Sequence, residues 1–439
     1  MRIIEGAALA RATILRRQQT SRTELGPAGR ARTAAVFGAE LSAVEAVQRI
    51  IDDVRAEGDA AVRRYCEAFD GVPYGRLEVP RAEVEAAPGA IEPSLRRALE
   101  YAAARVRRYH EGQLQRCLAS YADEEGLGVK VRPIETAGFY APGSVAPSSV
   151  IHTVVPARVA GVTNVVLVSP AGKDGALPAV ELAAAAIAGA DRVFMASGAQ
   201  AVAALAYGTE SFPRVDKICG PGSIFVTLAK RAVFGDVGID SIYGPTETVI
   251  VADDSADPAL CAVDLIAQAE HDELAAPLFI TSSRELAARV ADEVESRLAV
   301  LPREAVARAA FANRGGAVVA ASIEEAVELA SEYAPEHLCI LARDGHRLAG
   351  LVKNAGGLFI GEGSPEALGD YTAGPSHVMP TGGAARFASP LSVLDFLKFS
   401  TVVDLSGDKV YELGPPAAAI AHAEGLAGHA RAIEERLPR

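Results

Sequence analysis

The stretch 164–196, NVVLVSPAGKDGALPAVELAAAAIAGADRVFMA, contains two short apolar runs separated by an alanine-rich segment of helical length. The runs 164–168 and 192–196 are rich in apolar residues and bounded by turn-forming residues, which is typical of buried strands. The intervening segment 177–188 favours a helix. A strand, a helix and a second strand in this order predict a βαβ unit with parallel strands.

The same alternation continues in both directions along the chain. Around the central unit we expect strands at 137–140 and 217–219 and helices from residue 149, at 200–207 and at 223–234. A second series follows, with strands expected at 248–252, 278–281, 317–320, 338–341 and 357–360 and helices between them. The sequence therefore predicts an α/β protein with two Rossmann-like domains and parallel-type sheets.

The remaining segments define the expected domain boundaries. Residues 1–35 form a polar N-terminal arm, and 36–136 carry two helical patterns at 42–69 and 93–114. We expect 36–136 and 246–390 to form one discontinuous α/β domain that holds the metal and catalytic residues, with 137–245 inserted as the NAD domain. The C-terminal tail 391–439, which Gly414, Pro415 and Pro416 should interrupt, is too short to fold alone and must dock elsewhere, for example on a second subunit.

Charge and composition exclude several classes of partner. The 439 residues carry a formal net charge of −13, which disfavours nucleic acid and anionic membranes. No run reaches the about 18 apolar residues of a membrane helix, and the first residues lack a signal-peptide pattern. The five cysteines are scattered without CxxC pairs, as reduced thiols are. A cytoplasmic protein acting on small molecules is expected.

Two candidate metal ligands lie at the end of the helical run that begins near Pro258. Gln268 and His271 in the stretch 264–272, DLIAQAEHD, are three residues apart, so a helix would stack them on one face. There an amide oxygen and an imidazole nitrogen could share one ion. An isolated QxxH pattern also occurs at the solvent-exposed end of many amphipathic helices, so the pattern alone leaves both interpretations open.

Glycine-rich junctions between strands and helices are candidate dinucleotide sites. The segments 140–144 and 220–223 and the loop 198–200 follow predicted strands, at the edge where open α/β sheets bind ligands. Glycine admits close approach of the backbone to a ligand, and helix N-termini attract phosphate. None of the segments is the GxGxxG fingerprint, and tight turns explain such glycines equally well.

Three further segments carry residues suited to catalysis or metal binding. Pro335 should place Glu336 and His337 in a loop that enters a strand, where a carboxylate and an imidazole can act as acid and base. The polar loop 361–381 contains Asp370 and His377, and the C-terminal helix contains Glu424 and His429. An exposed loop and a solvent-facing histidine are the plain alternatives.

These segments together resemble the histidinol dehydrogenase family. The motifs that carry the resemblance are SGAQAVAALAYGTES (197–211), VDKICGPGSIFVTLAKRAVFG (215–235), QAEHD (268–272), APEHL (334–338), SPEALGDYTAGPSHVMPT (364–381), LSVLDFLK (391–398) and EGLAGH (424–429). They occur in the family's order and cover the chain from about residue 40 to its end.

The resemblance implies an activity and a site. The family oxidises L-histidinol through an aldehyde to L-histidine, reduces two NAD, contains zinc and forms homodimers with an exchanged C-terminal tail. By resemblance, zinc would be held by Gln268, His271, Asp370 and His429, and catalysis would be carried out by Glu336 and His337. NAD would contact Tyr140, Gln200 and Ser223. The substrate would contact Thr246, Gln268, His271, His337, Asp370, Glu424 and His429, the last two from the partner subunit.

The chain also departs from the family pattern. Ser223 stands where the family commonly has asparagine, Thr246 where it usually has serine, and the loop at 143–147 is shorter. These departures concern cofactor binding more than the zinc site. Two alternatives remain: a related zinc- and NAD-dependent dehydrogenase acting on another polar alcohol, and a catalytically silent zinc- and nucleotide-binding module, which the intact pair Glu336 and His337 disfavours.

Overall fold

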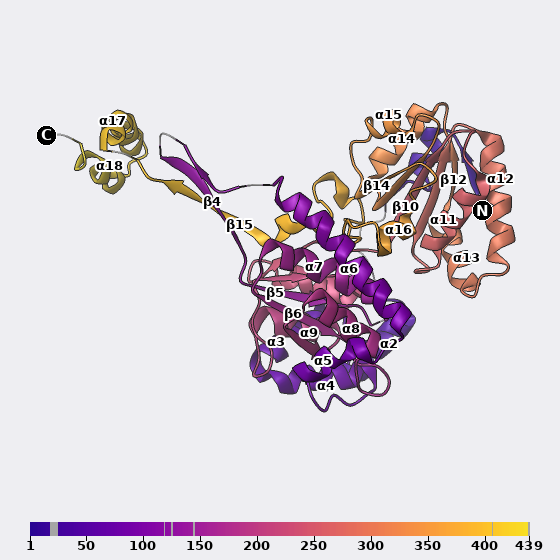
Figure 1. The fold of residues 1–439 in the computed structure, drawn as a ribbon, viewed down its shortest axis with the longest axis horizontal. Coiled ribbons are helices and arrows are strands. Elements are labelled where there is room, and N and C mark those ends of the chain that lie inside the picture. The colour runs from indigo at the N-terminus through magenta and orange to yellow at the C-terminus, as the bar shows by residue number, and fades with distance from the viewer. Residues whose placement is uncertain (18–24, 118, 124–125, 144, 406, 438–439) are drawn as a thin grey trace.

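The computed structural model describes residues 1–17, 25–117, 119–123, 126–143, 145–405 and 407–437. Two α/β bodies lie side by side, and the C-terminal segment projects from the first of them (Figure 1). Parallel strands dominate both large sheets. The expected class of two α/β domains with parallel-type sheets is therefore confirmed.

The first domain is built on a six-stranded sheet. Its strand order is β2 (Glu78–Val79), β7 (Arg192–Met195), β6 (Asn164–Ser169), β5 (Thr136–Tyr140), β8 (Lys217–Cys219) and β9 (Gly238–Ile239). All neighbours are parallel except β2 with β7. The chain runs outward from β5 to β6 and β7 and then returns to the other side at β8, so the carboxyl ends of β5 and β8 form a topological switch point, where such sheets bind ligands.

Helices on both flanks complete this domain. They are α2 (Pro27–Phe37), α3 (Ala43–Glu57), α4 (Asp59–Asp70), α5 (Arg81–Ala86), α6 (Pro93–Leu114), α7 (Pro147–Ala160), α8 (Ala179–Ala188), α9 (Gly198–Tyr207) and α10 (Ile224–Val233), with the 3-10 turn η2 (Ala87–Gly89). The helix expected at 42–69 is two helices, because Gly58 adopts a positive φ of 58° between α3 and α4.

The position of α3 to α6 corrects the predicted domain boundaries. The apolar stripe Val47, Ile50, Ile51 and Val54 of α3 is buried in the same core as β5, β6 and α9. Strand β2 also joins this sheet. Residues 36–114 therefore belong with the 137–245 unit and not with 246–390, because their apolar faces are buried against α9, α10 and α7.

The second domain has its own six-stranded parallel sheet. The order is β1 (Ile3–Glu5), β12 (Gly316–Val319), β11 (Ala276–Thr281), β10 (Glu247–Ala252), β13 (His337–Leu341) and β14 (Gly357–Ile360). Its helices are α1 (Ala7–Ala12), α11 (Pro258–Ala269), α12 (Arg284–Leu298), α13 (Glu304–Asn313), α14 (Ile323–Tyr333), α15 (Gly345–Ala349) and α16 (Glu366–Tyr371), followed by η3 (Ala384–Arg386).

Both faces of this sheet are covered, as its alternating side chains require. Ile250 and Ala252 of β10 pack into one apolar cluster with α11, α12 and α13, whereas Val249 and Val251 pack into the other with α1 and α14. The prediction of a separate N-terminal arm is wrong for its first residues. They are an integral part of the second domain, because β1 pairs with β12 from residue 3 onward.

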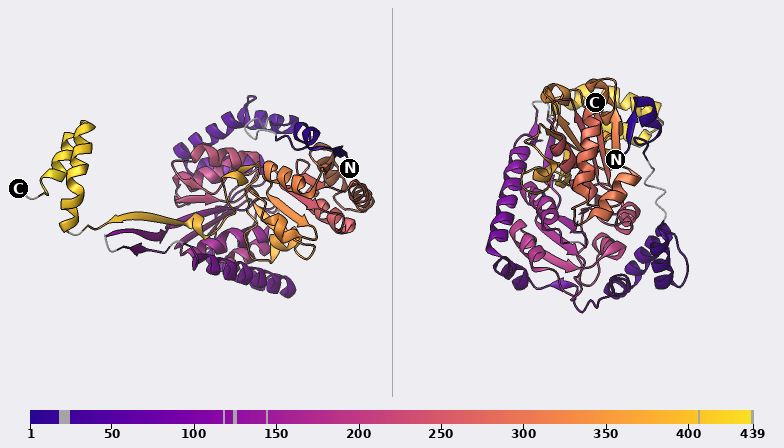
Figure 2. Two further views of the ribbon diagram at one scale, coloured as in Figure 1. Left: turned by 90° about the horizontal axis from the view of Figure 1, so that it is seen from above. Right: turned by 90° about the vertical axis from the view of Figure 1, so that its right-hand side faces the viewer.

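The C-terminal segment leaves the first domain as a ribbon. After η4 (Val393–Phe396), strand β15 (Leu397–Val403) pairs antiparallel with β4 (Leu127–Pro133), and β4 pairs with β3 (Tyr121–Ala122). Helices α17 (Gly407–Ala423) and α18 (Ala427–Glu434) pack on each other at the far end, separate from both domains (Figure 2). The tail is thus anchored in the first domain by Val393 and Phe396 of η4, which are buried in its core, and beyond η4 by the pairing of β15 with β4.

One local expectation about the tail is wrong. Pro415 and Pro416 lie inside α17 and do not end it. A proline removes the hydrogen bond to the carbonyl four residues earlier, which here belongs to Tyr411 and Glu412. Both of these residues are exposed, so water can bond to the freed carbonyls.

Within the described part of the chain, no helix combines the length and apolarity needed to cross a bilayer.

Candidate functional site

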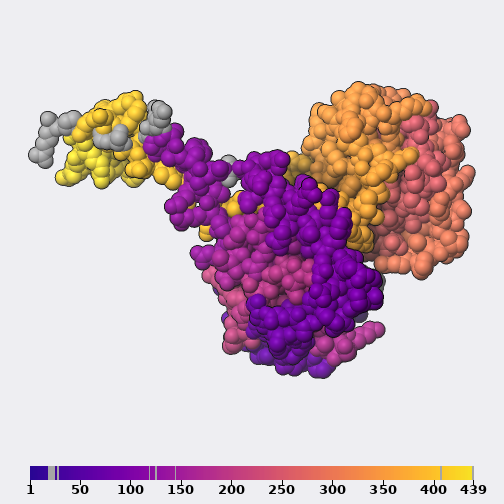
Figure 3. All heavy atoms as spheres, in the orientation of Figure 1, coloured from indigo at the N-terminus to yellow at the C-terminus, as the bar shows by residue number. Residues whose placement is uncertain are grey.

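A cleft of about 640 Å³ lies between the two domains. The first domain contributes residues of α6, the segment after β5 and the start of α7, and the second contributes residues around β10, α11, β13 and α16. The predicted site residues that line it are Thr246, Gln268, His271, Glu336, His337 and Asp370. The space-filling view shows how narrow the junction between the two bodies is on one face (Figure 3).

His337 is held in one orientation at the start of β13. Its Nδ1 lies 3.2 Å from the carbonyl oxygen of Glu247 on the neighbouring strand β10, so Nδ1–H donates to that oxygen. The opposite nitrogen, Nε2, is buried without a hydrogen-bond partner and lies 4.0 Å from Oδ1 of Asp370. His337 is therefore a strand residue and not the loop residue expected from the sequence, and its Nε2 is free to accept a proton.

Glu336 is buried beside it and bonded to two donors. Its Oε2 accepts from the Thr246 hydroxyl at 2.6 Å and from the Glu247 N–H at 3.1 Å. Burial raises the pKa of Glu336 to about 7, against the opposing effect of His337. Burial by itself would lower the pKa of His337, but the carboxylates of Glu336, Glu366 and Asp370 together raise it to about 8. Both groups thus exchange protons near neutral pH.

The amide of Gln268 faces the same cleft from α11. Its Oε1 lies 2.9 Å from the Thr246 hydroxyl, and its Nε2 donates to Glu366 at 2.7 Å. Thr246 has one hydroxyl hydrogen, and the ionised carboxylate of Glu336 is the closer and stronger acceptor for it. When Glu336 is ionised, Oε1 of Gln268 is left without a donor, as an oxygen that binds a cation should be.

The cleft contains three of the four predicted metal ligands, Gln268, His271 and Asp370. His271 lies just beyond the end of α11, not within the helix, but its N–H bonds to the Gln268 carbonyl at 3.2 Å and so continues the helical path. Asp370 is on α16, and its backbone carbonyl accepts from His377 Nδ1 at 2.8 Å. The imidazole of His377 is stacked on that of His152 from α7, with ring centroids 4.4 Å apart. This stack joins the two domains beside Asp370.

The fourth predicted ligand is not brought to this cleft within one chain. His429 and Glu424 are exposed, on α18 and just before it, at the far end of the tail (Figure 1). Among the residues that the structure describes, no three His, Cys, Asp or Glu side chains meet in a metal-binding arrangement. Gln268, His271 and Asp370 offer the oxygen and nitrogen donors that zinc accepts, so the residues present fit an incomplete zinc site.

The predicted NAD residues lie at the carboxyl edge of the first sheet. Tyr140 ends β5, and its hydroxyl accepts from the Gly198 N–H at 3.3 Å. Gln200 on α9 is buried, and its Oε1 has no partner. Ser223 is exposed at the N-cap of α10. An unpaired buried acceptor and a free helix N-terminus on one edge fit a dinucleotide. Ser144, the last residue of the 140–144 segment, lies outside the described residues.

The Gly220 turn is held close to β5. A Cβ at Gly220 would meet the Tyr140 carbonyl oxygen at 2.2 Å, and its φ of 112° is unfavourable for other residues. Its carbonyl accepts from Lys230 at 2.9 Å and its N–H donates to Asp240 at 2.7 Å, and Lys230 and Asp240 form a buried ion pair. This glycine is therefore required by local packing, whatever ligand the turn binds.

Sequence reasoning missed residues that support the site without lining it. Glu366 is buried, at 2% exposure, and lies about one helical turn before Asp370 on α16. An acidic residue in the motif 364–381 was the signal in the sequence that could have identified it. His152, which had no recognisable motif, is identified only by its stack on His377. Arg17 in the N-terminal segment pairs with Glu247, whose backbone bonds to both Glu336 and His337.

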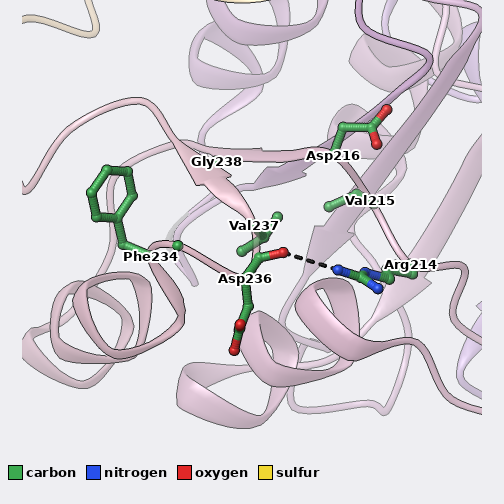
Figure 4. A pocket seen from close by; sticks show the side chains of 8 residues that line it. Arg214, Val215, Asp216, Phe234, Asp236, Val237 and Gly238 are labelled. Atoms are coloured by element: carbon green, nitrogen blue, oxygen red, sulfur yellow. Dashed lines mark hydrogen bonds between the residues drawn. The ribbon is translucent and has the colours of Figure 1, made fainter. Parts of the chain in front are cut away.

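A second hollow, on the first domain, holds none of these residues. Figure 4 shows it lined by Arg214, Asp216, Phe234 and Asp236, with the Arg214 guanidinium donating to the Asp236 carbonyl at 3.0 Å. The Arg214 guanidinium is thus hydrogen-bonded within the chain. We therefore assign catalysis to the cleft between the domains.

Comparison with known proteins identifies the family to which the chain belongs. The family model described as histidinol dehydrogenase matches residues 38–437. The chain is 48% identical over 441 residues to histidinol dehydrogenase of Deinococcus radiodurans and 46% identical over 439 residues to that of Dehalococcoides mccartyi, with all of each chain covered. The crystal structure of histidinol dehydrogenase from Elizabethkingia anophelis superposes with a TM-score of 0.89 at 29% identity, covering 99% of this chain and 98% of that one.

Proposed function

The chain belongs to the histidinol dehydrogenase family, and from that premise we propose that it oxidises L-histidinol through L-histidinal to L-histidine with two NAD⁺. The observation that carries the proposal is that one cleft holds both a buried imidazole nitrogen without a hydrogen-bond partner, His337 Nε2, and an amide oxygen, Gln268 Oε1. The imidazole nitrogen of His337 is suited to proton transfer, and the amide oxygen of Gln268 is suited to binding a cation and its ligand.

In the first oxidation His337 is the general base. Its Nε2 accepts the hydroxyl proton of the substrate while the hydride on the same carbon passes to the nicotinamide, so an alcohol and NAD⁺ give an aldehyde, NADH and a proton. The bond from Nδ1–H to the Glu247 carbonyl supports this role, because it fixes the ring and leaves Nε2 as the basic nitrogen.

In the second oxidation Glu336 assists the addition of water. Its carboxylate takes one proton from the water as the water oxygen adds to the aldehyde carbon, and returns it to the former carbonyl oxygen to give the hydrate. The hydrate passes a hydride to a fresh NAD⁺ and loses two protons, which leaves the carboxylate and NADH. The raised pKa of Glu336, about 7, suits a group that both accepts and returns a proton. Retention of the aldehyde between the two steps requires a cleft that excludes bulk water.

Gln268, His271 and Asp370, with His429 from a partner subunit, would hold zinc. Bound zinc would supply a positive charge that anchors and orients the imidazole and amino nitrogens of the substrate. Thr246 and Glu424 would add substrate contacts. Tyr140, Gln200 and Ser223 would contact NAD at the edge of the first sheet.

A homodimer with exchanged tails would complete the site. The tail helices extend away from their own domains and expose apolar side chains, among them Tyr411, Leu413 and Ile420. A second copy would cover this surface and bring His429 and Glu424 to a cleft that lacks them. We place the enzyme in the cytoplasm, where its five free cysteines remain reduced.

The decisive experiment is a count of NADH formed per histidinol consumed by the purified protein. We expect two NADH and one histidine. One NADH with accumulating aldehyde, or turnover only with another polar alcohol, would contradict the proposal.

A further inference from the structure

Glu366 lies directly behind the cleft without lining it. It begins α16 and is one of the most buried carboxylates of the second domain. Three donors from three different elements converge on it: the Thr248 hydroxyl of β10, the Cys339 thiol of β13 at 3.1 Å, and Nε2 of Gln268 from α11 at 2.7 Å. A buried carboxylate with its own set of donors is a built feature, because an unpaired charge at this position would be costly.

The contact with Gln268 decides which way its amide points. In the observed orientation Nε2 donates to Oε2 of Glu366, and Oε1 is directed toward Thr246 and the cleft. The flipped amide would set its oxygen against the carboxylate oxygen and leave a buried repulsion between two acceptors. Removal of the carboxylate removes this preference.

Glu366 also places negative charge near the cleft. Its Oε2 is 3.9 Å from His337 Nδ1, and it is one of the three carboxylates that raise the pKa of His337. A buried charge is weakly screened, so it also attracts a cation held by the neighbouring Gln268 oxygen.

We propose that Glu366 is a positioning residue, which holds the Gln268 amide with its oxygen toward a divalent cation in the cleft. The inference rests on the proposed function, because it assumes that Gln268 binds this cation. Groups of this kind, one bond behind a metal ligand, commonly change metal affinity by about 10- to 100-fold when replaced.

The first test measures zinc binding in the absence of substrate. Metal-free protein is titrated with zinc in competition with a chromophoric chelator. We expect Glu366→Gln to bind zinc at least about tenfold more weakly than the wild type. Glu362→Gln is the matched control, since Glu362 is exposed four residues earlier, and its affinity should be unchanged. An affinity of Glu366→Gln equal to that of the control would overturn the proposal.

The second test asks whether the effect passes through Gln268. In a Gln268→Ala background, Glu366→Gln should lower zinc affinity by less than threefold, because the amide that it orients is gone. The exchanged pair, Gln268→Glu with Glu366→Gln, restores an oxygen ligand and a donor behind it. It should bind zinc more tightly than Glu366→Gln alone. A full loss in the Gln268→Ala background, or no recovery in the exchanged pair, would show that Glu366 acts independently of Gln268 and would refute the proposal.

Thermal unfolding of each metal-free variant separates these results from misfolding, because positioning of the amide predicts weaker zinc binding at an unchanged unfolding temperature. A loss of zinc affinity that simply follows a lowered unfolding temperature in both Glu366→Gln and the exchanged pair would count against it. Failure of the proposed function looks different: the wild-type protein itself would then bind no zinc or form no NADH from histidinol.

Discussion

The Nδ1 atom of His337 lies 3.2 Å from the carbonyl oxygen of Glu247, on the adjacent parallel strand of the second sheet. This contact makes His337, the proposed catalytic base, part of the sheet framework. Because strand pairing fixes both partners, the ring cannot turn without breaking a buried hydrogen bond, and Nε2 remains directed at the cleft.

The two half-reactions should respond differently to the two catalytic residues. His337→Asn should reduce oxidation of histidinol by about 10²- to 10⁴-fold, because it removes the group that accepts the hydroxyl proton. Glu336→Gln should impair oxidation of supplied histidinal more than oxidation of histidinol. Steady-state rates with each substrate measure both effects. Equal losses in the two half-reactions would contradict the assigned roles.

Removal of the metal should abolish turnover while leaving the fold intact. Dialysis against a chelator should abolish NADH formation, and added zinc should restore it, because the proposed ligands Gln268, His271 and Asp370 line the cleft. Circular dichroism before and after dialysis serves as the control for unfolding. Undiminished activity in protein shown by elemental analysis to be free of metal would refute a role for zinc.

Complementation between subunits tests the exchanged tail. A His429→Ala subunit keeps an intact Glu336 and His337, and a subunit with Glu336→Gln and His337→Asn keeps an intact tail. If each cleft uses its partner's tail, a mixed dimer contains one complete site and should recover up to about half of the wild-type activity per dimer. Each parent homodimer provides the inactive baseline. A verified heterodimer with no gain over the parents would argue that each tail serves its own chain.

Ser223→Asn should strengthen NAD binding. Ser223 is exposed at the N-cap of α10, and asparagine is an equally good N-cap, so the helix should be unaffected. The longer amide can make one further hydrogen bond to the dinucleotide, worth about 1 kcal/mol, so the KM for NAD should fall about fivefold. The KM for histidinol is the internal control, because its proposed contacts Thr246, Gln268 and His271 line the cleft and Ser223 does not. An unchanged KM for NAD would place Ser223 outside the cofactor site.

The stability of the first domain should fall as pH rises through the region where Glu181 ionises. Burial raises the pKa of Glu181 to about 7, although Ser169 donates to it at 2.7 Å. The folded state thus holds this proton more tightly than the unfolded state, whose pKa is near 4.5. The contribution of Glu181 to stability is therefore present below about pH 4.5 and is lost between there and about pH 7.

Glu181→Gln keeps an acceptor for Ser169 without the buried charge, so it should be more stable than the wild type by about 1–3 kcal/mol at pH 8. This advantage should shrink toward pH 5. Urea unfolding at both pH values measures it, with Glu285→Gln on the exposed start of α12 as control. The same difference at both pH values would mean that Glu181 is ionised throughout the range.

Much of the secondary structure follows from sequence, because strand and helix patterns depend on local periodicity. The strands expected at 217–219 and 357–360 coincide with β8 and β14. Other boundaries shift where one residue changes the backbone, as Gly58 does between α3 and α4. The predicted interruption of the tail at Pro415 and Pro416 is wrong, because both prolines lie inside α17. Water can bond to the carbonyls that lose their helical hydrogen bonds, and this exposure cannot be read from the sequence.

The sequence by itself determined the α/β class, the order of the strands along the chain and the residue types available for chemistry, since these depend on neighbouring residues and on motifs that can be read directly. Only the tertiary structure decided that the helices of 36–114 pack on the first sheet, and that Gln268, His271, His337 and Asp370 share one cleft. It also decided which nitrogen of His337 is free and that Glu366 bonds to the Gln268 amide. The physical reason is that these relations depend on packing and hydrogen bonds between segments far apart in the chain, on which local periodicity carries no information.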